Sequence, residues 1–280
     1  MSWYILSYTL ISVVQHDKLF SKLRACGIDG ILLQWIINLF GNSTFCTRII
    51  EILSSVVRML SGVIHGRVVG PIMFLVYIND LIDILARYNV KVKLFADDVK
   101  LYLRAVNAVD VVVLHETLAA LVSWAAEWQL SVSVTKCGVL YIGKDNNTVE
   151  QFSINNTPLP IVTFYSDLGI TITSDLSPSF HIDCVVSKAH QPANIIHRCF
   201  VSRNADLLVR AFITYVCPLL EYNSVTWSHH LKHDIERLEK VQRRFTKRLH
   251  DFSSLPYDER LKKLNVDSLE QRKLYFDLLW

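Results

Sequence analysis

An acidic hairpin is the feature that most constrains how this chain can fold. The apolar stretch 92–96 and the β-prone stretch 99–103 flank the adjacent carboxylates Asp97 and Asp98. Hydrophobic runs on either side of a short polar turn are typical of two antiparallel strands, so the sequence predicts a β-hairpin with both acids at its tip. Ionised groups are costly to bury without a partner, and oxygen-rich clusters suit hard cations such as Mg²⁺. The tip therefore indicates metal-assisted phosphoryl chemistry.

The two acids do not make a complete two-metal site by themselves. Successive side chains of a strand face opposite ways, and two ions roughly 3.5–4 Å apart need a further carboxylate from another segment. The alternative is an ordinary Asp-Asp turn, because such dipeptides are common in turns.

A glycine-rich segment precedes the hairpin. Gly62, Gly66 and Gly70 recur every four residues, and Pro71 follows them. Glycine lets a backbone approach a ligand closely, and proline is favoured at the first position of a helix. A loop that enters a helix here would present free amides to phosphate. The alternative is a flexible linker, since glycine clusters also mark plain turns.

Together these motifs resemble those of one known family. The segment 61–71, the run Tyr77-Ile78-Asn79-Asp80-Leu81 and the hairpin Phe95-Ala96-Asp97-Asp98 are similar, in order and spacing, to the reverse transcriptases of non-LTR (LINE-type) retrotransposons. The similarity extends from Val14 to the C-terminus, with further matching segments at 16–28, 124–143, 167–169, 218–222 and 238–244. Within these, Asp167-Leu168-Gly169 resembles the short turn that grips the primer.

The resemblance implies an α+β fold: a polymerase palm, with an antiparallel sheet flanked by helices, over 1–175, and a mostly helical thumb or post-palm lobe over 176–280. It implies two-metal nucleotidyl transfer that extends a DNA primer on an RNA template with deoxynucleoside triphosphates. Asp97 and Asp98 would be catalytic and would bind Mg²⁺, and Lys136 would give a proton to the leaving pyrophosphate. The incoming nucleotide and the template base would be bordered by loop residues, namely Gly62, His65, Gly66, Arg67 and Gly70.

The first catalytic motif of the family is not matched. Counting back from His16 puts its metal-binding Asp at Leu6 and its second acidic residue at Ser12, and leucine cannot ligate magnesium. Residues 1–15 contain no Asp, Glu or His that could replace it. We therefore expect an N-terminally truncated, degenerate copy without complete fingers that is inactive as a polymerase. The alternative is a non-catalytic remnant that binds nucleic acid, or a reading frame without a working product.

The coarse pattern along the chain predicts alternating strands and helices. Apolar clusters in 1–14 predict a strand buried on both faces. Serine and proline residues that interrupt the pattern near 175 predict a domain boundary, with helices from 177 onward. Between these, we expect helices over 17–26, 29–40, 68–88 and 109–128, a strand over 44–50, the acidic hairpin over 92–103, and turns at 145–147 and 155–158.

One C-terminal segment is strongly amphipathic. Apolar residues recur at three- and four-residue steps through 234–249, and four basic residues share another face of the predicted helix: Arg237, Lys240, Arg244 and Lys247. Such a stripe could lie along a nucleic-acid backbone, where cations release counterions. A solvated basic face is the alternative, because Glu236 and Glu239 are interspersed. We expect no zinc site at His229, His230 and His233, since no Glu or Cys ligand is suitably spaced.

Composition and cysteine usage bear on location. The net charge is only +3 over 280 residues, so binding to a polyanion has to come from a local patch. The six cysteines show no paired short spacing, and the apolar N-terminus is shorter than the roughly 20 residues that cross a bilayer. We expect reduced thiols, a nuclear or cytoplasmic location and no membrane association.

Overall fold

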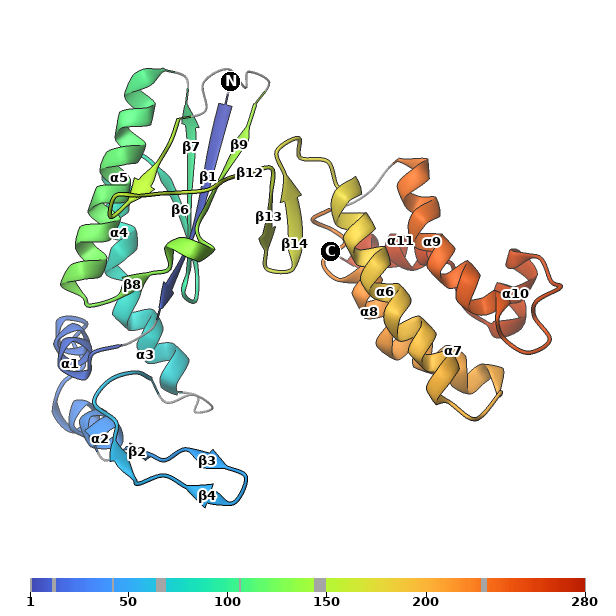
Figure 1. Ribbon diagram of the computed structural model, residues 1–280, viewed down its shortest axis with the longest axis horizontal. Helices are drawn as coiled ribbons and strands as arrows, with labels where there is room; N and C mark the ends of the chain where they lie inside the picture. The colour runs from blue at the N-terminus through green and yellow to red at the C-terminus, as the bar shows by residue number, and fades with distance from the viewer. Residues whose placement is uncertain are drawn as a thin grey trace. The chain divides into compact units, whose positions relative to one another are not determined.

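The computed structural model describes residues 2–11, 14–41, 43–63, 69–105, 107–143, 150–227 and 231–279 (Figure 1). The chain divides into two compact units, Met1–Thr163 and Phe164–Trp280. Each unit has its own cluster of buried apolar residues, and the two clusters share no residue.

The N-terminal unit is organised around a sheet of mostly antiparallel strands. Its described strands are β1 (Ser2–Ile11), β6 (Lys91–Phe95), β7 (Asp98–Ala105), β8 (Ser131–Val132), β9 (Gly138–Ile142) and β12 (Ile161–Val162). They are ordered β12-β9-β1-β7-β6, with β8 also paired to β1, and only β12 runs parallel to its neighbour. The predicted N-terminal strand is confirmed, and it lies between β9 and the acidic hairpin.

Helices supply the rest of this unit's core. They are α1 (His16–Ala25), α2 (Gly30–Gly41), α3 (Val69–Ile78), α4 (Asp80–Ala86) and α5 (Ala108–Glu127). Figure 1 shows α4 and α5 along one side of the sheet, and Leu118 and Leu121 of α5 are buried in the same core as Val99, Leu101 and Val139 of the sheet. A capping box between Asn107 and Asp110 starts α5. The helix predicted over 68–88 is confirmed, with a break at Asn79.

Shorter hairpins make up the connections. Between α2 and the glycine segment, β2 (Thr44–Phe45) pairs with β5 (Val57–Arg58), and β3 (Arg48–Ile49) pairs with β4 (Ile52–Leu53). The strand predicted over 44–50 is thus interrupted. Further on, β10 (Ser153–Ile154) pairs with β11 (Thr157–Pro158) through Asn155 and Asn156, both with positive φ, which confirms the predicted turn. The turn predicted at 145–147 lies outside the described residues.

The C-terminal unit joins one hairpin to a group of helices. The hairpin consists of β13 (Phe164–Asp167) and β14 (Ile170–Thr173). The helices are α6 (Ser179–Cys199), α7 (Ala205–Tyr215), α8 (Cys217–Glu221), α9 (Lys232–Lys247), α10 (Tyr257–Leu264) and α11 (Leu269–Leu279). They share a core around Ile182, Phe212 and Phe245. The compact units divide at 163/164, so this hairpin belongs with the helices; the assignment of palm and thumb to these parts stays a prediction.

The mixture of helices and antiparallel sheet confirms the α+β class. Two described helical stretches, Val69–Ala86 and Ala108–Glu127, are long and apolar enough to cross a membrane, but 39% and 33% of their residues are buried inside the protein. Length and composition alone are weak evidence, because core helices of globular proteins meet the same criteria. All six cysteines are free, and the predicted nuclear or cytoplasmic location stays a prediction.

Candidate active site

The acidic hairpin has the predicted form. Phe95 pairs with Asp98, which leaves Ala96 and Asp97 as the two residues of the turn. Ala96 adopts a φ of 49°, in the left-handed region that residues with a Cβ rarely occupy. Both aspartates are half-buried, whereas Phe95 is exposed. The turn therefore places two consecutive aspartates at one end of the sheet.

Strand β1, the segment expected to carry the family's first motif, lies directly beside this hairpin. The register, however, pairs Thr9 with Asp98, and it pairs Leu6 with Leu101 of β7 and Val139 of β9. Residue 6 is thus three positions from the acidic end, about 10 Å along the strand at 3.3 Å per residue. Ser12, the other position where the family has an acid, lies outside the described residues.

Lys136 is at the same end of the sheet as the two acids. Ser7 of β1 pairs with Lys100 on one side and with Gly138 on the other. Asp98 lies two residues before Lys100, and Lys136 lies two residues before Gly138. Because these strands run antiparallel to β1, both residues flank β1 near residue 9. Lys136 is exposed at the end of the short helical turn η1 (Val134–Lys136). With strands about 4.8 Å apart, the two backbones are separated by roughly 10 Å. The topology brings them to one end of the sheet, and their catalytic roles stay predictions.

The start of the glycine segment is tied to the chain that follows β1. Gly62 has a φ of 92°, a conformation that favours glycine, and its N–H donates to the Val14 carbonyl oxygen at 2.8 Å. Its own carbonyl oxygen lies 3.0 Å from His16 Nε2. Gly70 is buried in the first turn of α3. The other predicted loop residues, His65, Gly66 and Arg67, lie outside the described residues.

The described residues contain no group of three or more His, Cys, Asp or Glu side chains that could hold a metal ion. Asp97 and Asp98 supply hard oxygen ligands, which is the chemistry that Mg²⁺ prefers. The described part of the hairpin's neighbourhood adds no further carboxylate to them. Of the three histidines at which no zinc site was expected, His229 and His230 lie outside the described residues. The third, His233, has its Nε2 3.2 Å from Asp234 Oδ1.

A buried lysine, which the sequence motifs did not explain, joins three of the matched segments. Lys22 of α1 donates from Nζ to Asp80 Oδ1 at 2.5 Å and to the Tyr77 carbonyl oxygen. The same nitrogen lies 3.6 Å from the ring centroid of Trp128, whose carbonyl oxygen accepts from the Tyr77 hydroxyl at 2.6 Å. Burial lowers the pKa of Lys22, and the Asp80 carboxylate opposes that shift. Only the tertiary contacts identify these residues as one cluster.

The predicted basic face lies on α9. Arg237 is engaged by Asp183 of α6 at 3.1 Å, whereas Lys240, Arg244 and Lys247 are exposed and have no ion pair in the described part of the chain. Burial lowers the pKa of His190 on α6, and the positive charges of Arg244 and Lys240 lower it further. The free part of this face thus lies towards the C-terminal end of α9.

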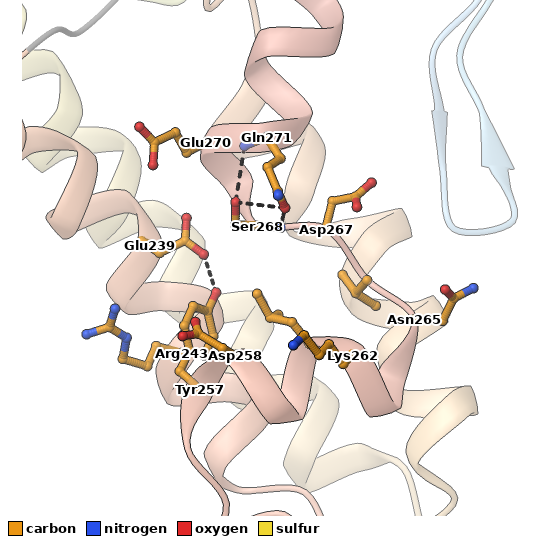
Figure 2. A pocket seen from close by; sticks show the side chains of 12 residues that line it. Glu239, Arg243, Tyr257, Asp258, Lys262, Asn265, Asp267, Ser268, Glu270 and Gln271 are labelled. Carbon is orange, nitrogen blue, oxygen red and sulfur yellow. Dashed lines mark hydrogen bonds between the residues drawn. The ribbon is translucent and has the colours of Figure 1, made fainter.

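A cavity of about 660 Å³ lies between α9, α10 and the start of α11 (Figure 2). Figure 2 shows Glu239 hydrogen bonded to the hydroxyl of Tyr257, and the second oxygen of Glu239 accepts from the Leu269 N–H at 3.1 Å. The charged groups around it are mixed, with carboxylates in excess of the cations Arg243 and Lys262. This lining does not suit a phosphate or a nucleotide, and it includes none of the predicted site residues.

Comparison with known proteins agrees with the geometry of the N-terminal unit. Residues 12–172 match the family described as reverse transcriptase (RNA-dependent DNA polymerase). Among curated proteins, the chain is 22% identical over 263 residues to the RNA-directed DNA polymerase from mobile element jockey of Drosophila funebris, covering 91% of the chain and 28% of that protein. The corresponding protein of Drosophila melanogaster is 22% identical over 223 residues, which is 76% of the chain and 24% of the relative.

An uncharacterized protein of Caenorhabditis elegans is 28% identical over 112 residues, covering 39% of the chain and 57% of that protein. The chain spans only about a quarter of the length of the two jockey polymerases. The matches confirm the resemblance to polymerases of non-LTR mobile elements. The region matched by the family begins after β1 and contains the glycine segment and the acidic hairpin. The chain belongs to the reverse transcriptase (RNA-dependent DNA polymerase) family.

Proposed function

We propose that this chain is a polymerase domain of a jockey-like retroelement whose lineage extends a DNA primer on an RNA template, and that the chain itself lacks nucleotidyl transfer activity. One observation carries the proposal. The acidic hairpin lies beside β1, where the family's opposing carboxylate belongs, yet residues 2–11 of β1 contain no acid.

The ligand set for a pair of magnesium ions is incomplete. Two ions held in such a site would activate the primer 3′-hydroxyl and stabilise the leaving pyrophosphate. Asp97 and Asp98 could contribute ligands, but a pair of ions needs a carboxylate from a second segment as well. Position 6 does not supply one, because it is a leucine; its partners across both neighbouring strands, Leu101 and Val139, are apolar and fully buried.

Primer extension tests the proposed loss of activity. The full chain is incubated with an RNA template, a DNA primer, deoxynucleoside triphosphates and either Mg²⁺ or Mn²⁺. We expect no more cDNA from the wild type than from Asp97→Ala or Asp98→Ala, because the wild-type site already lacks a ligand. Robust synthesis that Asp97→Ala abolishes would show that a complete site forms and that the proposal is wrong.

A second function, nucleic-acid binding without catalysis, is favoured by the unpaired basic residues of α9. Lys240, Arg244 and Lys247 could contact a phosphate backbone, since cations that neutralise phosphates release counterions and gain affinity. The double variant Arg244→Glu/Lys247→Glu should weaken RNA binding and reduce the slope of log affinity against log salt by about 2.

The control reverses the same number of charges on other helices. Arg210 of α7 and Lys263 of α10 are also exposed, so Arg210→Glu/Lys263→Glu should keep more of the affinity. Binding that falls only in the α9 variant supports the nucleic-acid function. An affinity equal in the α9 variant and the wild type would mean that these side chains form an ordinary solvated face.

A further inference from the structure

A pocket in the C-terminal unit is lined by cations. It has a volume of about 380 Å³ and lies where the end of α6, the chain before α7 and the end of α9 meet. Its charged or titratable lining groups are His197, Arg203, Arg248 and His250, and the described residues that line it include no carboxylate. A hollow surrounded by guanidinium and imidazole groups favours an anion.

The two arginines of the pocket have no carboxylate partner among the described residues. Arg248 donates to the uncharged amide oxygen of Asn194 at 2.6 Å, and Arg203 is exposed with no ion pair among the described residues. A carboxylate does contact one member of the set, because Asp251 Oδ2 lies 2.7 Å from His250 Nδ1. Asp251 is outside the pocket lining. The guanidinium charges of Arg203 and Arg248 are therefore not neutralised in place.

His197 forms one wall of the pocket. Its ring packs on Phe245 with centroids 4.4 Å apart, and the backbone of Phe245 hydrogen bonds to it. Its Nε2 atom is buried and has no hydrogen-bond partner among the described residues. A buried polar atom without a hydrogen-bond partner destabilises the folded state. The His197 ring lines the pocket and is held in place by Phe245, so its resonances can report occupancy of the pocket.

We propose that this pocket binds a phosphate group, with Arg203 and Arg248 as its main ligands and His250 as a further donor. Guanidinium forks match the oxygens of phosphate in geometry and charge. The phosphate could belong to a nucleic-acid backbone or to a free phosphorylated compound, because both present the same tetrahedral oxygens. The inference does not require polymerase activity, and it uses residues other than those proposed to bind RNA on α9.

Titration with inorganic phosphate tests the pocket in the full chain. Imidazole resonances of His197 and His250, assigned with His197→Gln and His250→Gln, are followed by NMR at constant pH and ionic strength. We expect both to shift with saturation in the wild type. In Arg203→Gln/Arg248→Gln, the apparent affinity should fall at least tenfold, because the variant loses both guanidinium contacts to the phosphate.

The control variant, Arg210→Gln/Lys263→Gln, removes the same charge from exposed positions outside the pocket. It should bind phosphate as the wild type does. The single variant Arg203→Gln, at an exposed loop position, keeps the test valid if the double variant does not fold. Absence of saturable shifts in the wild type, or equal shifts in wild type and pocket variant, would overturn the inference.

A competition arm identifies the source of the phosphate. An RNA oligonucleotide that displaces inorganic phosphate from the pocket indicates a backbone phosphate, and RNA that leaves the phosphate shifts unchanged indicates a free phosphorylated compound. Either result follows only from a phosphate-binding pocket. If RNA does not bind at α9 but phosphate still binds in the pocket, the nucleic-acid function is rejected and the phosphate pocket stands.

Discussion

Lys22 places a charge in the interior of the N-terminal unit, where it is only 7% exposed. Its ammonium is held by Asp80 and by the π-faces of Trp128, Tyr77 and Trp124, at 3.6, 5.1 and 5.2 Å from the ring centroids. Cation–π contacts are stronger when desolvated, at about 2 kcal/mol or more. The cluster therefore ties α1, which follows β1, to the helices that follow the glycine segment and the hairpin.

The pH dependence of stability should report this burial. Burial lowers the pKa of Lys22 from the usual 10.5, so the folded chain releases this proton at lower pH than the unfolded chain does. The unfolded state then binds more protons, and the free energy of unfolding rises with pH between the lowered pKa and 10.5. Urea unfolding of Lys22→Met should lack this rise, whereas Lys93→Met, at an exposed position of β6, should keep it. Equal pH dependence in Lys22→Met and the wild type would count against the assignment.

At the scale of elements, a buried carboxylate joins the last three helices. Glu239 of α9 is 8% exposed, and it accepts hydrogen bonds from Tyr257 at the start of α10 and from the Leu269 N–H at the start of α11. The guanidinium of Arg243 packs over the Tyr257 ring at 4.8 Å. Burial raises the pKa of Glu239, and the Tyr257 hydroxyl opposes the rise by stabilising the carboxylate.

Tyr257→Phe should therefore destabilise the C-terminal unit. Removing a buried hydrogen bond to a charged group costs about 1.5–3 kcal/mol, while the aromatic ring and its packing remain. The pKa of Glu239 should rise further in the variant, so the destabilisation should shrink as the pH falls and Glu239 becomes protonated in both proteins. Urea unfolding at several pH values measures this. Tyr275→Phe, at a residue of α11 that is 60% exposed, is the matched control and should be close to neutral.

At the scale of the whole molecule, the two compact units have separate cores. Chains with more than one such unit commonly unfold in more than one step. Leu121→Ala in the N-terminal core and Ile182→Ala in the C-terminal core each truncate a fully buried side chain, at a cost of about 2–5 kcal/mol. Each substitution should lower the midpoint of one unfolding transition and leave the other in place, as followed by hydrogen exchange of residues from each core. If each substitution lowers the midpoints of both transitions equally, the chain unfolds as one cooperative unit.

Local sequence patterns predicted much of the secondary structure correctly. The hairpin around Asp97 and Asp98, the N-terminal strand, the turn at Asn155 and Asn156 and the helix over Ala108–Glu127 were all predicted from periodicity and turn residues. These features depend on interactions between neighbours in the chain, so the sequence alone is sufficient to identify them. The family was likewise evident from motif order and spacing.

The tertiary structure decided which distant residues meet. It paired Thr9, rather than Leu6, with Asp98, and it assigned the hairpin β13–β14 to the C-terminal unit. It also gathered Lys22 with Asp80, and His197 with Arg248, across separations of about fifty residues. Strand register and helix packing depend on the burial of whole apolar faces against distant elements. The sequence by itself thus determined the local elements and the family, whereas long-range packing determined the register of the acidic site and the cationic pocket.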